Sequence, residues 1–361
     1  MGNSKVAVLK TSPETVLEDY NRLAELAEMD KYLQRGRATI LKDNISWHLL
    51  YPSANSTPWQ LEGTILALRD KGYDDIVDVH NDTVVTNPHK GEKFNKYDLV
   101  YKKHDIPVRF NCVPGDLSWI PYQPKGEMLV LKKIYNEGIR IPEFFIGKNI
   151  VHLPTVKTHI YTTTTGSMKN AFGGLLNTKR HYTHSVIHQT LVDLLTIQKE
   201  IHTGIFTFMD GTTAGSGPGP RTMTPHEKDI ILASGDPVAI DATAAKLMGF
   251  NPLSLPYIRI THERGLGVGD PRDIEVVGEE VSNVNWNFTV GDNFASKFGD
   301  LFWFSPLKVF QRLLFHTPLV YLFVFASAFY HDYLWYPLKG KPVVERWKEE
   351  SKWGRLFESY K

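Results

Sequence analysis

The sequence predicts an α/β fold, with a layered and mostly parallel β-sheet, flanking helices, and a hydrophobic, aromatic helical tail at the C-terminal end. Two observations carry this prediction. Short apolar runs typical of strands alternate with longer segments whose apolar residues recur at helical spacing. Beyond residue 291 this alternation stops and aromatic residues become frequent. We therefore expect an α/β domain over 1–291, as one body or as lobes at 1–147 and 148–291, and a membrane-associating tail over 292–361.

The first half of the chain has the pattern of strand–helix units. In the first helix, Ser12 takes the N-cap position and Pro13 the first helical position. His80, Asn81 and Asp82 end the third strand, and we rank them below the motifs of the second half. The expected elements are strands at 5–10, 38–44 and 75–82, helices at 12–34 and 57–73, and a weak helix followed by a short strand within 96–110.

The second half continues the alternation. A strong strand within 148–159 runs into a polar loop, and a helix begins near Met168. The segment 237–249 opens with Pro and closes with Gly, as helices commonly do. The other expected elements are a helix at 185–201 and strands at 204–211, 228–236 and 273–281. Strands that alternate with helices in this way indicate a mostly parallel sheet.

Composition excludes several classes of protein. The formal net charge of +1 gives no global attraction to nucleic acid, so we expect no nucleic-acid partner. A single cysteine, Cys112, rules out a disulfide framework and a cysteine-ligated cluster built by this chain alone, and it suits a reducing compartment. The N-terminal residues lack the apolar run of a signal peptide. We therefore expect a cytoplasmic location.

The tail carries a membrane signal. Residues 313–330 contain no formally charged side chain, a run at the lower limit of a membrane span. Pro318 interrupts the run, and basic residues flank both of its ends, which disfavours simple spanning. We expect a peripheral or monotopic anchor in the plane of the membrane, and a buried extension or oligomer interface is the alternative. Four aromatic residues are expected at the lipid headgroups: Trp303, Tyr321, Trp335 and Tyr336.

An ordered set of motifs resembles the domain-of-unknown-function family 362. The motifs are "LPTVKTH" (153–159), "GSMKNAFGGL" (166–175), "KRHYTH" (179–184), "DGTTAGSGPGP" (210–220) and "ILASGDPVAIDATAAKLMG" (231–249). The resemblance implies a fold and a site but no settled reaction. Two features depart from the family. Lys42-Asp43-Asn44 stands where relatives have Lys-Pro-Asn, and the cysteine-rich ferredoxin-like module of many members is absent from this sequence.

The stretch "VKTHIYTTTTGSMKNAFGGLLNTKRHYTH" (156–184) is rich in Thr, His and Lys and poor in acid. Free backbone N–H groups at the start of its helix, with Lys157, Lys169 and the threonine hydroxyls, predict an anion pocket. Lys157, Thr165 and Asn170 are the expected substrate-binding residues. Lys169 is the expected catalytic lysine, as a point charge or a desolvated base. A solvated loop with capping threonines is the alternative.

Histidines provide a second signal. His159 and His184 lie inside the family motifs, and we expect them to transfer protons near neutral pH. His181, His184 and His188 have i, i+3, i+7 spacing, so a helix would align them on one face. Such a face predicts acid/base groups or a divalent metal site, and a plain surface face is the alternative.

Acidic and glycine residues provide a third signal. Asp210 ends a strand at a glycine-rich turn, where α/β sheets place ligand-facing side chains. Gly217 and Gly219 let the backbone approach a bound group. Asp236 has a helix-capping role as an equal alternative to a functional one. Asp241, on an apolar helix, requires a partner, which we expect to be Lys157, Lys169 or a metal.

These features together predict a membrane-associated enzyme of unresolved reaction that acts on an anionic, lipid-like substrate. Lys157 and Lys169 hold the anion, His159 or His184 moves protons, and Asp210 or Asp241 orients a base or binds a divalent metal. Two alternatives remain open. One is a non-catalytic protein that binds a cofactor and docks on a membrane complex. The other is a redox accessory protein that uses the cluster of a partner.

Overall fold

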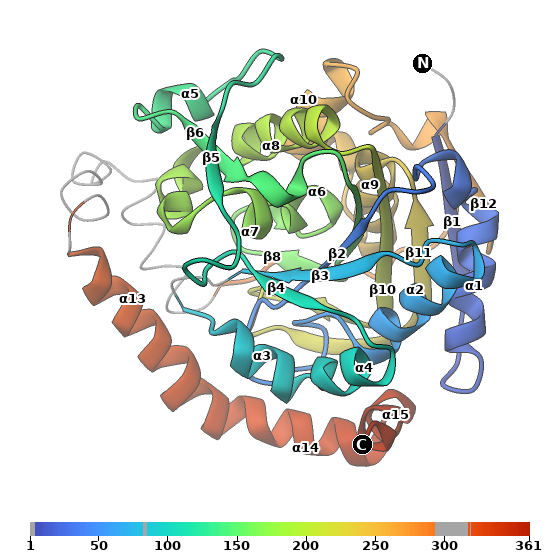
Figure 1. Cartoon of the computed structure of the whole chain (residues 1–361). Helices are drawn as coiled ribbons and strands as arrows, with labels where there is room; N and C mark the ends of the chain where they lie inside the picture. The colour runs from blue at the N-terminus through green and yellow to red at the C-terminus, as the bar shows by residue number, and fades with distance from the viewer. Residues whose placement is uncertain (1–3, 82–84, 293–316, 318) are drawn as a thin grey trace.

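The chain folds around a ten-stranded sheet in the computed structural model, which describes residues 4–81, 85–292, 317 and 319–361 (Figure 1). The main strand order is β12-β1-β11-β10-β7-β2-β3-β4, and β8 and β9 branch from β10. The strands are β1 (Ser4–Lys10), β2 (Thr39–Asp43), β3 (Ile76–His80), β4 (Val108–Phe110), β7 (Asn149–Leu153), β8 (Thr155–His159), β9 (Thr163–Thr164), β10 (Gly204–Ser216), β11 (Thr224–Ser234) and β12 (Ile274–Gly278). A separate antiparallel hairpin consists of β5 (Trp119–Tyr122) and β6 (Ile139–Pro142).

Most of the main sheet is parallel. Strands β10, β7, β2, β3 and β4 pair in parallel along its length, and β12 is parallel to β1. Strand β11 runs antiparallel to both β1 and β10. The predicted α/β class is therefore confirmed. Because β2 pairs with β7, strands from 1–147 and from 148–291 lie in one sheet.

Helices cover both faces of the sheet (Figure 1). On one face, α1 (Val16–Leu26), α2 (Pro58–Asp70) and α4 (Tyr97–Lys103) pack on Leu41, Val151 and Phe208, with α3 (Pro88–Phe94) beside α4. On the other face, Ile40 and Ile150 pack on the remaining helices. These are α6 (Ser167–Asn170), α7 (Phe172–Leu175), α8 (Ile187–Ile201), α9 (Pro237–Met248) and α10 (Pro256–Glu263), with α5 (Leu131–Ile134) beside them. Alternate residues of one strand thus enter different cores.

Two local predictions were wrong. The first helix begins at Val16 with Thr15 as its N-cap, because the Ser12 carbonyl accepts the N–H groups of Thr15 and Val16 in a preceding turn. The single strand expected over 148–159 is two strands. Pro154 separates β7 from β8, and the β-branched residues of β8 pair with β10 and β9.

The tail is helical where it is described. It comprises α13 (Val320–Ala328), a π-helical segment (Phe329–Gly340), α14 (Lys341–Glu350) and α15 (Lys352–Ser359). It runs beneath α3 and α4 and ends near α2 (Figure 1), where Trp353 contacts Trp59 with ring centroids 5.3 Å apart. No helix among the described residues is long and apolar enough to cross a membrane. Residues 293–316 and 318, including Trp303 and Pro318, lie outside the described part.

Candidate functional site

The carboxyl ends of β2 and β7 mark the point where the chain changes direction across the sheet. From β2 the chain proceeds to β3 and β4 on one side, whereas from β7 it proceeds to β10 on the other. In open α/β sheets, ligands bind outside the carboxyl ends of the strands at such a switch point. The residues at this edge are therefore the first to consider.

Five basic residues of the segment 157–188 gather beside this edge, and we call them the basic cluster: Lys157, His159, Lys169, His184 and His188. Burial, followed by the charges of Lys169, His184, Lys157 and His188, holds the pKa of His159 well below its usual value. The structure thus brings together the predicted residues Lys157, His159, Lys169 and His184, which the sequence separates by up to 27 positions (184 − 157).

Lys157 is buried and bound to its own fold. Its Nζ donates to Asn44 Oδ1 at 2.5 Å, to Ser46 Oγ at 3.1 Å and to the Ala54 carbonyl. All three acceptors are neutral. Burial, followed by the charge of Lys169, lowers the pKa of Lys157 well below that of a free lysine. The fold therefore already engages the donors of Lys157 and disfavours its charged form.

Lys169 is partly exposed and belongs to α6. Its Nζ lies 5.7 Å from the centre of the Phe172 ring. Burial, followed by the charge of Arg180, lowers the pKa of Lys169 to about 8. Across the described part of the chain, no carboxylate lies within ion-pair distance of Lys157 or Lys169. Positive charge without a counter-ion is costly in a partly buried site, so the basic cluster favours an anionic ligand.

The backbone N–H groups at the start of α6 are not free as predicted, because the protein's own Asp241 occupies that position. The Asp241 carboxylate accepts the backbone N–H groups of Ser167 at 2.6 Å and Met168 at 3.1 Å. Burial raises the pKa of Asp241 to about 8. Its partner in the structure is thus the start of the helix that carries Lys169, and not the side chain of Lys157 or Lys169. Asp241 is a positioning residue for Lys169.

Asp210 has a structural environment. Its buried carboxylate accepts hydrogen bonds from Thr57 Oγ1 at 2.6 Å, Trp59 Nε1 at 2.9 Å, and both the backbone N–H and the hydroxyl of Thr212 at 2.7 Å. Burial raises the pKa of Asp210, and these hydrogen bonds oppose the rise. The carboxylate therefore ties β10 to the start of α2, and its predicted catalytic role stays a prediction.

Thr165 and Asn170 also contact the protein itself. Thr165 Oγ1 lies 3.3 Å from the carbonyls of Thr155 and Lys157. Asn170 Nδ2 donates to the Lys42 carbonyl at 2.6 Å and lies 3.5 Å from His152 Nδ1. These bonds join α6 and β9 to the sheet edge. The predicted substrate-binding roles of both residues therefore stay predictions, since their polar groups already have protein partners.

The glycine-rich turn approaches the protein's own backbone. A side chain at Gly219 would meet the Thr158 carbonyl at 1.9 Å. The Gly217 carbonyl accepts a hydrogen bond of 2.6 Å from Thr158 Oγ1. The close approach predicted for these glycines is therefore present, but the neighbouring group is β8.

The predicted histidine face does not form on one α-helix. Residues Thr178–Val186 are a 3₁₀ helix, and α8 begins only at Ile187. His184 lies against the rings of Tyr161 and Phe172, whereas His188 stacks on Tyr257 at 5.9 Å. The side chain of His181 lies outside the described part.

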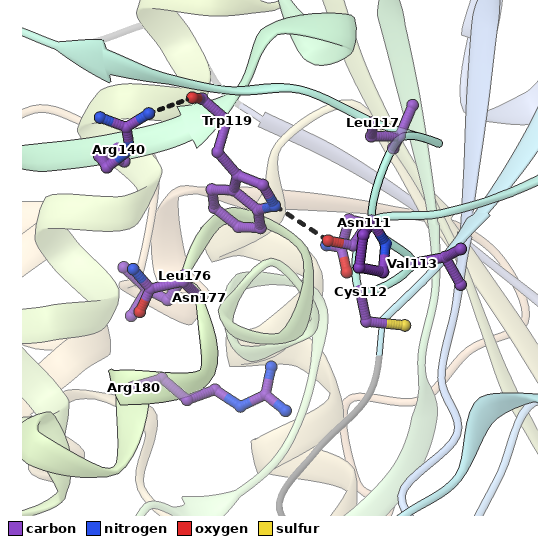
Figure 2. Close-up of a pocket in the computed structure, with 10 residues that line it drawn as sticks. Asn111, Cys112, Val113, Leu117, Trp119, Arg140, Leu176, Asn177 and Arg180 are labelled. Atoms are coloured by element: carbon purple, nitrogen blue, oxygen red, sulfur yellow. Dashed lines mark hydrogen bonds between the residues drawn. The ribbon is translucent and has the colours of Figure 1, made fainter.

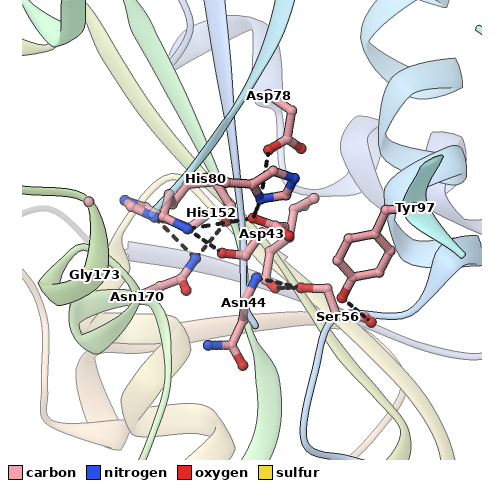
Figure 3. A network of polar contacts seen from close by, with 12 residues as sticks. Asp43, Asn44, Ser56, Asp78, His80, Tyr97, His152, Asn170 and Gly173 are labelled. Atoms are coloured by element: carbon pink, nitrogen blue, oxygen red, sulfur yellow. Dashed lines mark hydrogen bonds and ion pairs between the residues drawn. The ribbon is translucent and has the colours of Figure 1, made fainter. Parts of the chain in front are cut away.

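A second group, of which the sequence analysis considered only His80 as a site residue, is drawn in Figure 3: Asp43, Asp78 and His80. His80 Nδ1 lies 3.1 Å from Asp43 Oδ1 and 3.8 Å from Asp78 Oδ1. Burial, followed by the Asp43 charge, raises the pKa of Asp78 to about 7. Burial opposes protonation of His80, but the Asp43 carboxylate outweighs it and raises the pKa of His80. His80 was singled out at its strand end, whereas Asp82 lies outside the described part.

A cavity of about 290 Å³ opens beside the basic cluster (Figure 2). Its lining is Asn111, Cys112, Val113, Pro114, Leu117, Trp119, Arg140, Leu176, Asn177 and Arg180. Trp119 is held by a hydrogen bond of 2.9 Å from Nε1 to the Asn111 carbonyl, and Arg140 donates to the Trp119 carbonyl. Arg180 joins the two regions, because it lines the cavity and its charge lowers the pKa of Lys169. The sequence analysis named only the motif that contains Arg180.

The fold and the site define an α/β protein with a group of basic residues at the carboxyl edge of its sheet. Residues 40–246, more than half of the chain, match the model of the family described as Domain of unknown function (DUF362), and the chain belongs to this family. The predicted resemblance is confirmed.

One curated relative shows a more limited similarity. Over 120 residues the chain is 25% identical to the thylakoid-associated protein sll1697 of Synechocystis sp. (strain ATCC 27184 / PCC 6803 / Kazusa). The match covers 32% of this chain and 37% of that relative, so the chain spans well under half of the relative's length. No solved structure matches the chain.

Proposed function

We propose that this protein is a membrane-associated enzyme that acts on an anionic, lipid-like substrate through the basic cluster. The observation that supports it best is that two neighbouring lysines, Lys157 and Lys169, lack a carboxylate partner across the described residues. A bound carboxylate or phosphate would supply the missing counter-charge. The reaction and the exact substrate are not part of the proposal.

The ionisation of the cluster suits proton transfer. The Tyr161 backbone N–H donates to His159 Nδ1 at 3.1 Å. The neutral ring therefore carries its own proton on Nε2, where it can donate to an anion. Lys169, with a pKa of about 8, exchanges its proton near neutral pH and can serve as the base once deprotonated. Donor and acceptor roles thus fall to two different residues of the cluster.

The cavity suits an amphiphilic ligand. Arg180 stands between the cavity and Lys169, whereas Leu117, Trp119 and Leu176 supply apolar walls. Ligand sites in proteins are mostly apolar, with a few polar groups that fix orientation. A ligand with its anionic head at Arg180 and Lys169 and its apolar chain against Trp119 would match both the charged and the apolar side chains.

The tail supports membrane attachment. Eight large apolar residues of the tail are exposed: Leu319, Tyr321, Leu322, Phe325, Phe329, Tyr333, Leu334 and Leu338. The rings of Phe325, Phe329 and Tyr333 stack in a row at about 6 Å spacing. An exposed apolar row on a helix is typical of an in-plane membrane anchor. We place this anchor on the cytoplasmic face. The thylakoid-associated name of the relative fits a membrane location.

Two of the expected headgroup aromatics face the protein instead. Trp335 and Tyr336 contact Trp47, with ring centroids 5.9 and 5.2 Å apart. Asp332 also accepts the Trp47 Nε1–H at 2.7 Å. These contacts seat the inner side of the tail on the body. The proposed anchor therefore depends on the eight exposed apolar residues of the tail, of which Tyr321 is one.

Binding of decanoate, an alkyl carboxylate, tests the anion site. We expect Lys169→Ala to bind decanoate at least about tenfold more weakly than the wild type, because one charge-assisted contact is lost. Lys102→Ala, exposed on α4, is the matched control. Equal binding by the wild type and Lys169→Ala would contradict the site.

Incubation with a polar lipid extract, followed by mass spectrometry, tests turnover. Binding without consumption of any lipid would favour the non-catalytic alternative.

Flotation with phosphatidylglycerol vesicles tests the anchor. Phe329 and Phe94 are matched in exposure at 45% and 44%, but only Phe329 belongs to the apolar row. We expect Phe329→Asp to lower vesicle association and Phe94→Asp to leave it unchanged, because only the first puts a charge against the acyl chains. If both variants float like the wild type, the row does not anchor the protein.

A further inference from the structure

Three carboxylate oxygens in the group of Asp43, Asp78 and His80 have no partner at ordinary hydrogen-bond geometry: Asp43 Oδ2, Asp78 Oδ1 and Asp78 Oδ2. The Tyr101 hydroxyl is the polar group that approaches Asp78, and it partly offsets the rise in the pKa of that carboxyl. Both aspartates are fully buried, and His80 is 1% exposed. Buried polar atoms are nearly always hydrogen-bonded, and an unpaired buried carboxylate is costly. These oxygens therefore require an explanation that the basic cluster does not provide.

The geometry of the sheet holds the three side chains in place. Strands β2 and β3 are parallel, with Leu41 opposite Asp78, so Asp43 lies beside His80. Asp78 and His80 are two positions apart on β3 and point to the same face. One donor atom from each residue lies within 4.8 Å of the others. Donor atoms on one ion at about 2.1 Å lie about 3–4 Å apart, so roughly an ångström of closure would suffice.

The surroundings of His80 match those of a metal-bound imidazole. Its Nδ1 faces the two aspartates, whereas its Nε2 lies 3.4 Å from the Tyr101 hydroxyl and 3.7 Å from Glu92 Oε2 (Figure 3 shows the Nδ1 side). Metal-ligating histidines commonly donate their second ring N–H to a carboxylate, which fixes the ring and directs the other nitrogen at the ion. The Glu92 carboxylate lies on that side of the ring, beyond hydrogen-bond distance, and the Tyr101 hydroxyl lies nearer.

Lys42 is the remaining charge near the group. Its Nζ donates to the Asp43 carbonyl at 2.7 Å and lies farther, at 3.5 Å, from Asp43 Oδ1. An ion can therefore take the carboxylate while the lysine keeps its hydrogen bond. Lys42 does not reach Asp78 within ion-pair distance in the described residues, so it does not compete with an ion for the Asp78 oxygens.

We propose that Asp43, Asp78 and His80 bind a divalent first-row transition metal. Two carboxylates and one imidazole are the donors that Mn²⁺, Co²⁺ and Zn²⁺ accept. This site differs from the metal sites considered from the sequence, which involved Asp210, Asp241 or the histidine face. It stands independently of the proposed lipid-like substrate, because it uses none of the residues of the basic cluster.

Metal binding by the full chain tests the proposal. After removal of metals with EDTA, the protein is titrated with MnCl₂ or CoCl₂, and bound metal is measured by calorimetry and elemental analysis. We expect one ion per chain, a rise in Tm on addition of the metal, and visible absorption from bound Co²⁺. Asp78→Asn is expected to weaken binding at least about tenfold. Asp75→Asn, an exposed residue just before β3, is the matched control.

The possible outcomes distinguish a metal-binding site from a structural ion pair that binds no metal. Removing the charge of an unpaired buried carboxylate should leave Asp78→Asn at least as stable as the wild type in EDTA, so loss of binding will not reflect unfolding. Wild-type protein that binds neither metal and shows no rise in Tm would overturn the proposal, whatever the variants do. Undiminished binding in both Asp78→Asn and His80→Ala would overturn it as well, since the ion would then lie elsewhere.

Discussion

At the scale of single residues, the two lysines of the basic cluster have different tasks because their neighbours differ. Lys157 donates to neutral groups of its own fold, including Asn44 and Ser46. Lys169 is partly exposed, and burial and Arg180 disfavour its charged form. A ligand anion therefore gains more from Lys169, which is the residue to test by titration.

Affinity for decanoate is expected to fall as pH rises through about 8. Below the pKa of Lys169, which is about 8, the ammonium is present and attracts the carboxylate. Above it, binding must take up a proton, so affinity falls by up to about tenfold per pH unit. The carboxylate of decanoate stays ionised throughout this range. Calorimetric titrations on both sides of pH 8 measure the effect.

Lys169→Arg is the control for this titration. Arginine stays protonated at these pH values, so the variant should keep the charge and lose the pH dependence. A wild-type affinity that is constant across this range would show that Lys169 does not hold the anion.

At the scale of elements, α6 depends on a distant side chain. It has four residues, too few for a stable helix by itself. Asp241, on α9, accepts the first backbone N–H groups of α6, and Gly166 leaves room for that carboxylate. The position of Lys169 therefore depends on a contact between Ser167 of α6 and Asp241 of α9, which are 74 positions apart in the sequence.

Gly166→Ala is expected to destabilise the protein by at least about 2 kcal/mol, through strain and a clash. The residue has φ of 149°, and a Cβ would lie 2.2 Å from Asp241 Oδ1. Gly36→Ala is the matched control, since Gly36 has φ of 70° and open space around it. Strain alone should cost the control about 1 kcal/mol. Urea unfolding measures both, and equal losses would show that the Asp241 contact is not tight.

At the scale of the whole molecule, the tail joins parts of the body that are distant in sequence. Trp47 contacts the π-helical segment, and Trp59 contacts α15. Trp353 is fully buried, and its Nε1–H donates to Asp229 at 2.7 Å. The end of the tail is therefore part of the core, whereas the row from Leu319 onward faces outward.

Trp353→Ala is expected to lower the free energy of unfolding by about 3–5 kcal/mol, because a large buried side chain is removed from the core. Tyr333→Ala, at a tail position that is 72% exposed, should change it by no more than about 0.5 kcal/mol. Chemical denaturation compares the two. A small effect at Trp353 would mean that the tail is docked only loosely on the body.

Part of the fold and the site could be predicted because the relevant signals are local. The strands and helices follow from periodicity over a few residues, and the basic cluster lies mostly within one stretch rich in Lys and His. The acidic residues could not be assigned in this way. Asp210 and Asp241 stand at positions typical of ligand-binding residues, yet Thr57 and Ser167, far away in sequence, already donate to them.

The sequence by itself determined the alternation of strands and helices, the family, the cationic stretch and the apolar tail. Each of these depends on neighbouring residues along the chain. The tertiary structure decided which distant side chains meet: Asp43 beside Asp78 and His80, Arg180 beside Lys169, and Asp241 at the start of α6. The physical reason is that strand register and helix docking determine these contacts, and both arise only when the whole core is packed.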